Sequence, residues 1–271
     1  MMNTTVRQPA VAGHFYSRDP QALTRDLRSF FSPPEQKMKA LGCVVPHAGY
    51  IYSGHVAGSV YAAIELPRRF IILGPNHTGR GSPLAIMSSG AWQTPLGAAP
   101  IDSPLADQLR VACPYLEEDA VAHRGEHAIE VQLPFLQVAM PEFSFVPISV
   151  GTTRYEVLHA LGEGLAGMLS EEREKVLLIS SSDMNHYEDD STTREKDRKA
   201  IEKVLALDPR GLYDVVLSEA ITMCGFCPTV VMLVASKCLG ATSTKLVKYA
   251  TSGDISGDRS SVVGYAGIVI Q

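Results

Sequence analysis

The sequence lacks long apolar runs. Nowhere do about 18 consecutive apolar residues occur, the length at which a segment reads as a transmembrane helix. The stretch from Met1 to Ser17 also lacks the continuous apolar core of a signal peptide. Runs of basic residues are missing too, and the net charge is -5, so no surface for a phosphate backbone is indicated. We therefore expect a cytoplasmic protein that binds neither nucleic acid nor a membrane.

Cysteine is too scarce and too scattered for a disulfide framework. The 271 residues contain five cysteines, an odd number, whereas disulfide-rich domains are short and pair their cysteines closely. In a reducing compartment these are free thiols, metal ligands or redox groups. With 45% hydrophobic and 20% charged residues, the composition is that of a globular protein, and no linker divides the chain. We predict a single domain over residues 1–271.

Short, apolar, β-branched runs alternate with helical patterns along the chain. A strand, a helix and a strand in succession favour parallel pairing. We therefore predict an α/β sandwich whose central sheet, mostly parallel or mixed, is flanked by helices. Strands are predicted at 41–45, 70–73, 143–150, 176–180, 245–250 and 261–270, and helices from Asp19-Pro20, at 56–64, from Asp102, at about 126–139 with a kink or break at Pro134, at 155–169, 191–206 and 209–219, and from Cys224.

Three of the predicted strands are followed by a histidine. His47 follows the first strand, His77 the second, and His186, with Asp183, the strand that ends at residue 180. Ligands of open α/β sheets bind outside the carboxyl ends of the strands, so we expect these histidines to share a cleft. Imidazole suits iron, copper and zinc, and His47 and His77 form the natural ligand pair. The third ligand is Asp183, Cys224 or a glutamate, because spacing alone does not choose among them.

Cys224 and Cys227 form a C-x-x-C motif where a helix is predicted to begin, and the helix dipole favours a thiolate there. A redox dithiol would be expected near the start of a shorter βαβ domain. A structural zinc site would need a second pair of ligands that the sequence does not supply.

His123 and His127, four residues apart, share one helix face. With Glu130, they either cap the helix or contact substrate at the rim of the cleft.

Several motifs, taken together, identify a family. The chain resembles the Memo-like family, called AmmeMemoRadiSam system protein B in microbes, which is similar in fold to class III extradiol ring-cleaving dioxygenases. The matching stretches run in order from one end of the chain to the other: Arg7 to Gly13, Pro46-His47-Ala48-Gly49-Tyr50, Gly74-Pro75-Asn76-His77, Glu126-His127-Ala128-Ile129-Glu130, Gln132-Leu133-Pro134, Ser181 to His186, Cys224-Gly225 and Ser261 to Ala266.

This resemblance implies one metal ion held by His47, His77 and Cys224. It places His186 like the acid/base histidine of the dioxygenases, with Asp183 orienting it or a metal-bound water. Where the dioxygenases use a glutamate, Cys224 would supply a softer thiolate, which shifts the preference toward copper or zinc and puts catechol-type ring opening in doubt. Substrate contacts are expected from His127, Glu130, Tyr50, Asn76 and Cys227.

We consider three alternative functions for this cleft. The first is a non-haem oxidoreductase with iron(II) or copper, acting on a small aromatic or enolic substrate. The second is a non-catalytic adaptor that binds a peptide or partner protein, as Memo-like proteins in animals are regarded. The third is a zinc-dependent hydrolase in which water is activated between the metal and His186. The resemblance also suggests radical-SAM and AMMECR-type proteins as partners in one pathway.

Overall fold

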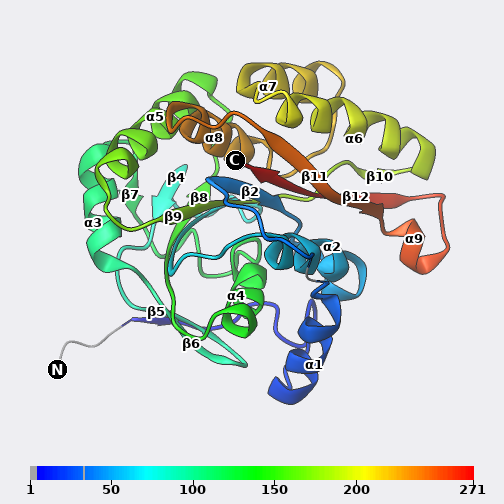
Figure 1. Cartoon of the computed structure of the whole chain (residues 1–271), viewed down its shortest axis with the longest axis horizontal. Helices are drawn as coiled ribbons and strands as arrows, with labels where there is room; N and C mark the ends of the chain where they lie inside the picture. Colours follow the sequence, from blue (N-terminus) through cyan, green and yellow to red (C-terminus); the bar gives the residue numbers. More distant parts are fainter. Residues whose placement is uncertain (1–4, 33) are drawn as a thin grey trace.

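A mixed β-sheet runs through the middle of the molecule and carries helices on both faces (Figure 1). The computed structural model describes residues 5–32 and 34–271, and within them this sheet has nine strands. The central strands lie in the order β2, β9, β3, β8 and are parallel to one another, while β12 and β4 flank them in antiparallel orientation. The strands are β2 (Gly42–Val45), β3 (Arg69–Pro75), β4 (Leu84–Ile86), β7 (Glu117–Glu118), β8 (Ser144–Val150), β9 (Val176–Ser181), β10 (His186–Glu188), β11 (Thr244–Thr251) and β12 (Val262–Ile270).

The helices form two layers because alternate residues of each central strand face opposite sides. In β3, Ile71 and Leu73 pack toward one layer, and Phe70 and Ile72 toward the other. The first layer contains α3 (Ser103–Ala112), α5 (Tyr155–Glu171), α6 (Asp190–Leu205), α7 (Pro209–Ser218) and α8 (Phe226–Cys238). The second contains α1 (Pro20–Phe30), α2 (Tyr50–Ala63) and α4 (Leu133–Ala139), next to a small sheet of β1 (Val6–Arg7), β5 (Ala91–Thr94) and β6 (Gly97–Pro100).

The predicted α/β architecture, a mixed sheet flanked by helices, is confirmed. The helix predicted at about 126–139 is different: a short 3-10 turn, η1 (Glu130–Gln132), leads into α4. Pro134 lies in the first turn of α4, where a missing backbone N–H breaks no helical hydrogen bond, so it begins a helix and does not kink one. Among the described residues, no helix combines the length and apolar composition that a membrane span requires.

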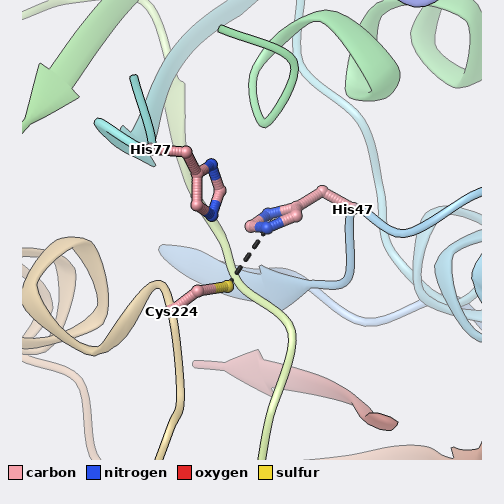
Figure 2. Close-up of side chains that lie close together, drawn as sticks. All are labelled: His47, His77 and Cys224. Carbon is pink, nitrogen blue, oxygen red and sulfur yellow. Dashed lines mark hydrogen bonds between the residues drawn. The ribbon is translucent and has the colours of Figure 1, made fainter. Parts of the chain in front are cut away.

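The topology brings distant loops to one edge of the sheet. Because β2, β9 and β3 are parallel neighbours, their carboxyl ends meet there, and the residues that follow each strand lie close together. His47 follows β2, His77 follows β3, and Asp183 follows β9. The loop between α7 and α8 reaches the same edge with Cys224, as the close-up in Figure 2 shows.

Candidate metal centre

The side chains of His47, His77 and Cys224 point toward one another (Figure 2). One ligand atom from each lies within 4.8 Å of the other two, and the Cys224 sulfur is 3.1 Å from Nε2 of His47. Two imidazole nitrogens and one sulfur form a donor set that suits zinc, copper or iron. The structure therefore groups the three ligands implied by the family resemblance around a single position.

A buried hydrogen-bond chain fixes the protonation of His47. Nδ1 of His47 lies 3.1 Å from the hydroxyl oxygen of Ser181. That hydroxyl donates its hydrogen to the carbonyl of Ala128 and also accepts from the side-chain amide of Gln132. Since its one hydrogen is already used, the Ser181 oxygen accepts the Nδ1–H of His47. Nε2 is then unprotonated, and its lone pair faces Cys224.

Removing the Ser181 hydroxyl is expected to weaken metal binding. The Ser181→Ala substitution leaves Nδ1 of His47 without its acceptor, and loss of such an outer contact lowers metal affinity by roughly 10–100-fold. Ser180→Ala is the matched control, because the buried Ser180 hydroxyl bonds to Thr229 and not to His47, His77 or Cys224. Competition with a chromophoric chelator measures both variants. Equal affinities for the two would show that the Ser181 contact has no effect on the metal.

His77 is held in the same way by a carboxylate. Its Nδ1 lies 2.9 Å from one oxygen of Glu126, and its backbone N–H donates to the other oxygen. Burial on its own raises the pKa of Glu126, but the bond from His77 and the backbone N–H groups outweigh it and lower the pKa to about 2. A carboxylate behind a ligating imidazole fixes the tautomer and makes the metal-facing nitrogen a better donor. Glu126 was not among the predicted site residues, although the resemblance includes it.

His186, predicted to move a proton, and Asp183, predicted to orient it or a metal-bound water, occupy the same edge. Asp183 is 4% exposed, and one of its oxygens accepts the backbone N–H groups of His47 and Ala48. Burial raises the pKa of Asp183 despite these bonds. Nδ1 of His186 lies 2.9 Å from the carbonyl of Thr222, which can only accept, so in the neutral ring Nδ1 carries the hydrogen and Nε2 the lone pair.

These groups line a cleft of about 490 Å³, which is large enough for one small molecule. Of the five predicted substrate contacts, His127 lies in it, with its ring stacked on that of His77 at 4.8 Å. The lining residues are Phe15, His47, Ala48, Gly49, His77, His127, Asp183, His186, Tyr187, Thr222, Cys224 and Val263.

The structure places the other four predicted contacts outside the cleft lining. The Tyr50 hydroxyl donates to a backbone carbonyl in the core, and the Asn76 side chain closes its own turn. Cys227 packs inside the helical layer of α8, where burial raises its pKa to about 12. Glu130 is completely buried beneath the N-terminal segment. All four make hydrogen bonds or packing contacts that the fold needs. Their place in the motifs suggested a role in the site, and the structure gives them a supporting role in the fold.

Glu130 supports the cleft from behind. It forms a buried ion pair with Arg7 and accepts a hydrogen bond from the Tyr16 hydroxyl. Arg7 also donates to the backbone carbonyl of Glu126. The segment held in this way places Phe15 in the cleft wall, with its ring 4.8 Å from that of His127. The ion pair therefore fixes both the loop behind His77 and one wall of the cleft.

Asp197 gives the fold a pH dependence that differs from that of most carboxylates. It is buried and accepts hydrogen bonds from the backbone of Asn185 and from the Tyr249 hydroxyl. Burial outweighs these bonds and raises its pKa from 3.8 to about 7. Between these two values the unfolded chain loses the proton that the folded chain keeps. The contribution of Asp197 to stability therefore falls as pH rises through this window and is constant above it.

We expect Asp197→Asn to remove that dependence. Asp197 changes the free energy of unfolding by at most about 1.4 kcal/mol per pH unit, the value for one proton. Urea unfolding at pH 5 and pH 8 measures it. The control is Asp107→Asn, since the Asp107 side chain is 70% exposed, and this variant should keep the wild-type slope. A wild-type slope in Asp197→Asn would mean that Asp197 is already ionised near pH 5.

Comparison with known proteins decides the family. The sequence profile described as "Memo-like protein" matches residues 7–269. The chain belongs to the Memo-like family. A MEMO1 family protein of Methanopyrus kandleri is 43% identical, over 98% of this chain and 99% of the relative. One from Aquifex aeolicus is 45% identical, over 97% and 98%. These matches confirm the family predicted from the motifs.

A solved structure resembles this Memo-like chain in fold alone. It is the crystal structure of an uncharacterized protein from Escherichia coli K12, with a TM-score of 0.56 and 13% identity. The likeness covers 84% of this chain and 98% of the other. At this identity the match supports the arrangement of sheet and helices, and the chemistry of the site has to be argued from the Memo-like chain's own residues.

Proposed function

We propose that this Memo-like protein is a metal-dependent enzyme whose ion is held by His47, His77 and Cys224. The observation that carries the proposal is the hydrogen bonding behind the two imidazoles. Both Nδ1 atoms have a buried acceptor, Ser181 for His47 and Glu126 for His77. The Nε2 atoms are therefore the free donors, and they lie on the side of the Cys224 sulfur. Histidines that bind metal ions usually donate the N–H of the other ring nitrogen in this way, and the partner sets the tautomer and the ring orientation.

The thiol completes the donor set when it loses its proton. Burial, followed by the nearby Asp183 carboxylate, raises the pKa of Cys224 in the metal-free chain well above its ordinary value. A cation between the sulfur and the imidazoles reverses this preference, because the thiolate is the form that binds. Metal binding should therefore release a proton from Cys224.

The finer part of the proposal is an oxidoreductase that acts on a small aromatic or enolic substrate. Bound iron(II) or copper supplies electron transfer and Lewis acidity. His186 takes a proton from a substrate hydroxyl at Nε2, because its Nδ1–H is held by the Thr222 carbonyl. The second Asp183 oxygen, 3.9 Å from Nε2 of His47, accepts a hydrogen bond from a water or hydroxyl beside the ligands.

A second candidate is zinc-dependent hydrolysis, which the thiol of Cys224 favours. Sulfur and imidazole donors suit zinc, and zinc with three protein ligands keeps a position for water. His186 would accept the proton of that water at the same nitrogen. The two candidates differ in the ion and share every residue.

Activity with defined metals tests the proposal. Protein purified without oxygen is loaded with iron(II), copper or zinc and offered catechols, enolic diketones and esters. We expect metal-dependent oxygen uptake on a flat hydroxylated substrate, lost in His186→Gln although this variant still binds metal. His159→Gln, on the outer face of α5, is the control. Ester hydrolysis with zinc alone would favour the second candidate. No metal-dependent turnover, with peptide capture by the metal-free chain, would favour an adaptor.

A further inference from the structure

Tyr187 has a backbone conformation that its side chain disfavours. Its φ is 64°, in the left-handed region that bulky residues rarely adopt. Within the described chain, two other non-glycine residues have positive φ, Leu207 and Ala220. Both lie just beyond the end of a helix, α6 and α7, where a left-handed residue commonly closes the last turn. Tyr187 ends no helix, so its conformation needs another explanation.

A β-bulge sets the direction of the Tyr187 side chain. In the pairing of β10 with β12, His186 lies opposite Val263 and Glu188 lies opposite Val262. Tyr187 is therefore the extra residue of the bulge. Neighbours in a regular strand point to opposite faces, yet His186 and Tyr187 both line the cleft, with their rings 5.5 Å apart. The bulge turns a second aromatic side chain to the face of His186.

Packing does not explain this arrangement. Tyr187 is 80% exposed, so its ring buries little surface in return for the strained backbone. Strained residues that persist without a packing role are typical of binding sites. Phe15 also lines the cleft and contacts the ring of His127. The cleft therefore offers aromatic surface at two places, on the His186 side and on the His127 side.

The cleft also lacks fixed positive charge. Among the described residues that line it, none is lysine or arginine, and its one carboxylate belongs to Asp183. Substrates with phosphate or carboxylate groups are usually held by arginine or lysine. A flat, uncharged ring fits these walls better than an anion does.

We propose that Tyr187 is a specificity-determining residue whose ring stacks on a flat, uncharged ring of the substrate at the mouth of the cleft. This inference rests on the proposed function, because it concerns the substrate of the same site. Stacking itself does not need the ion. The contact with Tyr187 can therefore be measured in metal-free protein, separately from metal binding.

The test compares flat and puckered ligands in three variants. The probes are catechol, trans-1,2-cyclohexanediol, which has two hydroxyls without a flat ring, and 3,4-dihydroxybenzoate, which adds a carboxylate. Binding to metal-free and zinc-loaded protein is followed by ligand-observed NMR. Tyr187→Ala should weaken catechol binding about three- to tenfold, the size of an aromatic pair contribution, and leave cyclohexanediol unchanged. Tyr187→Phe should keep catechol within twofold of wild type, and the benzoate should bind metal-free protein no better than catechol.

A stability measurement separates stacking from a structural role. Tyr187→Gly should melt at a higher temperature than Tyr187→Ala, because glycine adopts positive φ freely, while both bind catechol weakly. Unchanged catechol binding in Tyr187→Ala would overturn the proposal. So would catechol binding no tighter than cyclohexanediol in wild type, including no detectable binding of either. Failure of the chain to bind metal, with the Tyr187 effect intact in metal-free protein, would overturn the proposed function alone.

Discussion

Replacing Cys224 by serine is expected to abolish tight metal binding and to leave the chain folded. The sulfur lies 3.1 Å from Nε2 of His47 and within 4.8 Å of the donor atom of His77, so it is placed to complete the donor set. Metal binding at sites of this kind supplies roughly 10 kcal/mol or more, shared among the ligands. Loss of one of three donors should then weaken affinity by about a hundredfold or more.

The matched control for Cys224→Ser is Cys238→Ser. Cys238 is the exposed cysteine at the end of α8, and the substitution removes one thiol from the protein without touching the cleft. Affinity is measured by competition with a chromophoric chelator, and folding by circular dichroism. His47→Ala should behave as Cys224→Ser does. Wild-type affinity in Cys224→Ser would remove the thiol from the metal site.

Arg7→Ala is expected to destabilise the fold more than any surface substitution. The side chains of Arg7 and Glu130 are 5% and 0% exposed, so the substitution leaves a carboxylate buried without its partner. Breaking a buried ion pair from one side costs about 3–5 kcal/mol. The guanidinium also lies 4.3 Å from the centre of the Trp92 ring and donates to the carbonyl of His123, and both contacts are lost with it.

Arg68→Ala provides the comparison for Arg7→Ala. Arg68 pairs with Glu142 at the surface, where their side chains are 75% and 80% exposed, and such pairs contribute about 0–1 kcal/mol. Urea unfolding of both variants gives the two free energies. If Arg7→Ala lost no more stability than Arg68→Ala, Glu130 would have a second cation or water to replace the guanidinium, and the N-terminal segment would not depend on this pair.

The sequence predicts those site residues whose positions follow from the strands that precede them. His47, His77 and Asp183 follow strands whose apolar runs are easy to recognise, and parallel pairing brings the ends of those strands to one edge. Cys224 follows no strand, and it was chosen through the family resemblance. Its place beside His47 depends on the loop between α7 and α8, which no periodic pattern describes.

The supports of the site were harder to predict, for a physical reason. Glu126 lies 49 residues from His77 in a segment without regular structure, so neither spacing nor periodicity connects them. Glu130 and Tyr50 stand in motifs, yet their polar atoms face the core. A motif marks a position where a particular side chain is needed. The direction that the side chain faces is set by tertiary packing, which only the folded chain reveals.

X-ray absorption of zinc-loaded protein tests the central claim most directly, because it counts the donor atoms around the ion. The account predicts one sulfur at about 2.3 Å and two imidazole nitrogens at about 2.0–2.1 Å, with the sulfur lost in Cys224→Ser. A wild-type spectrum with only oxygen and nitrogen neighbours, or a chain that retains no zinc, would contradict the grouping of His47, His77 and Cys224 around one metal ion.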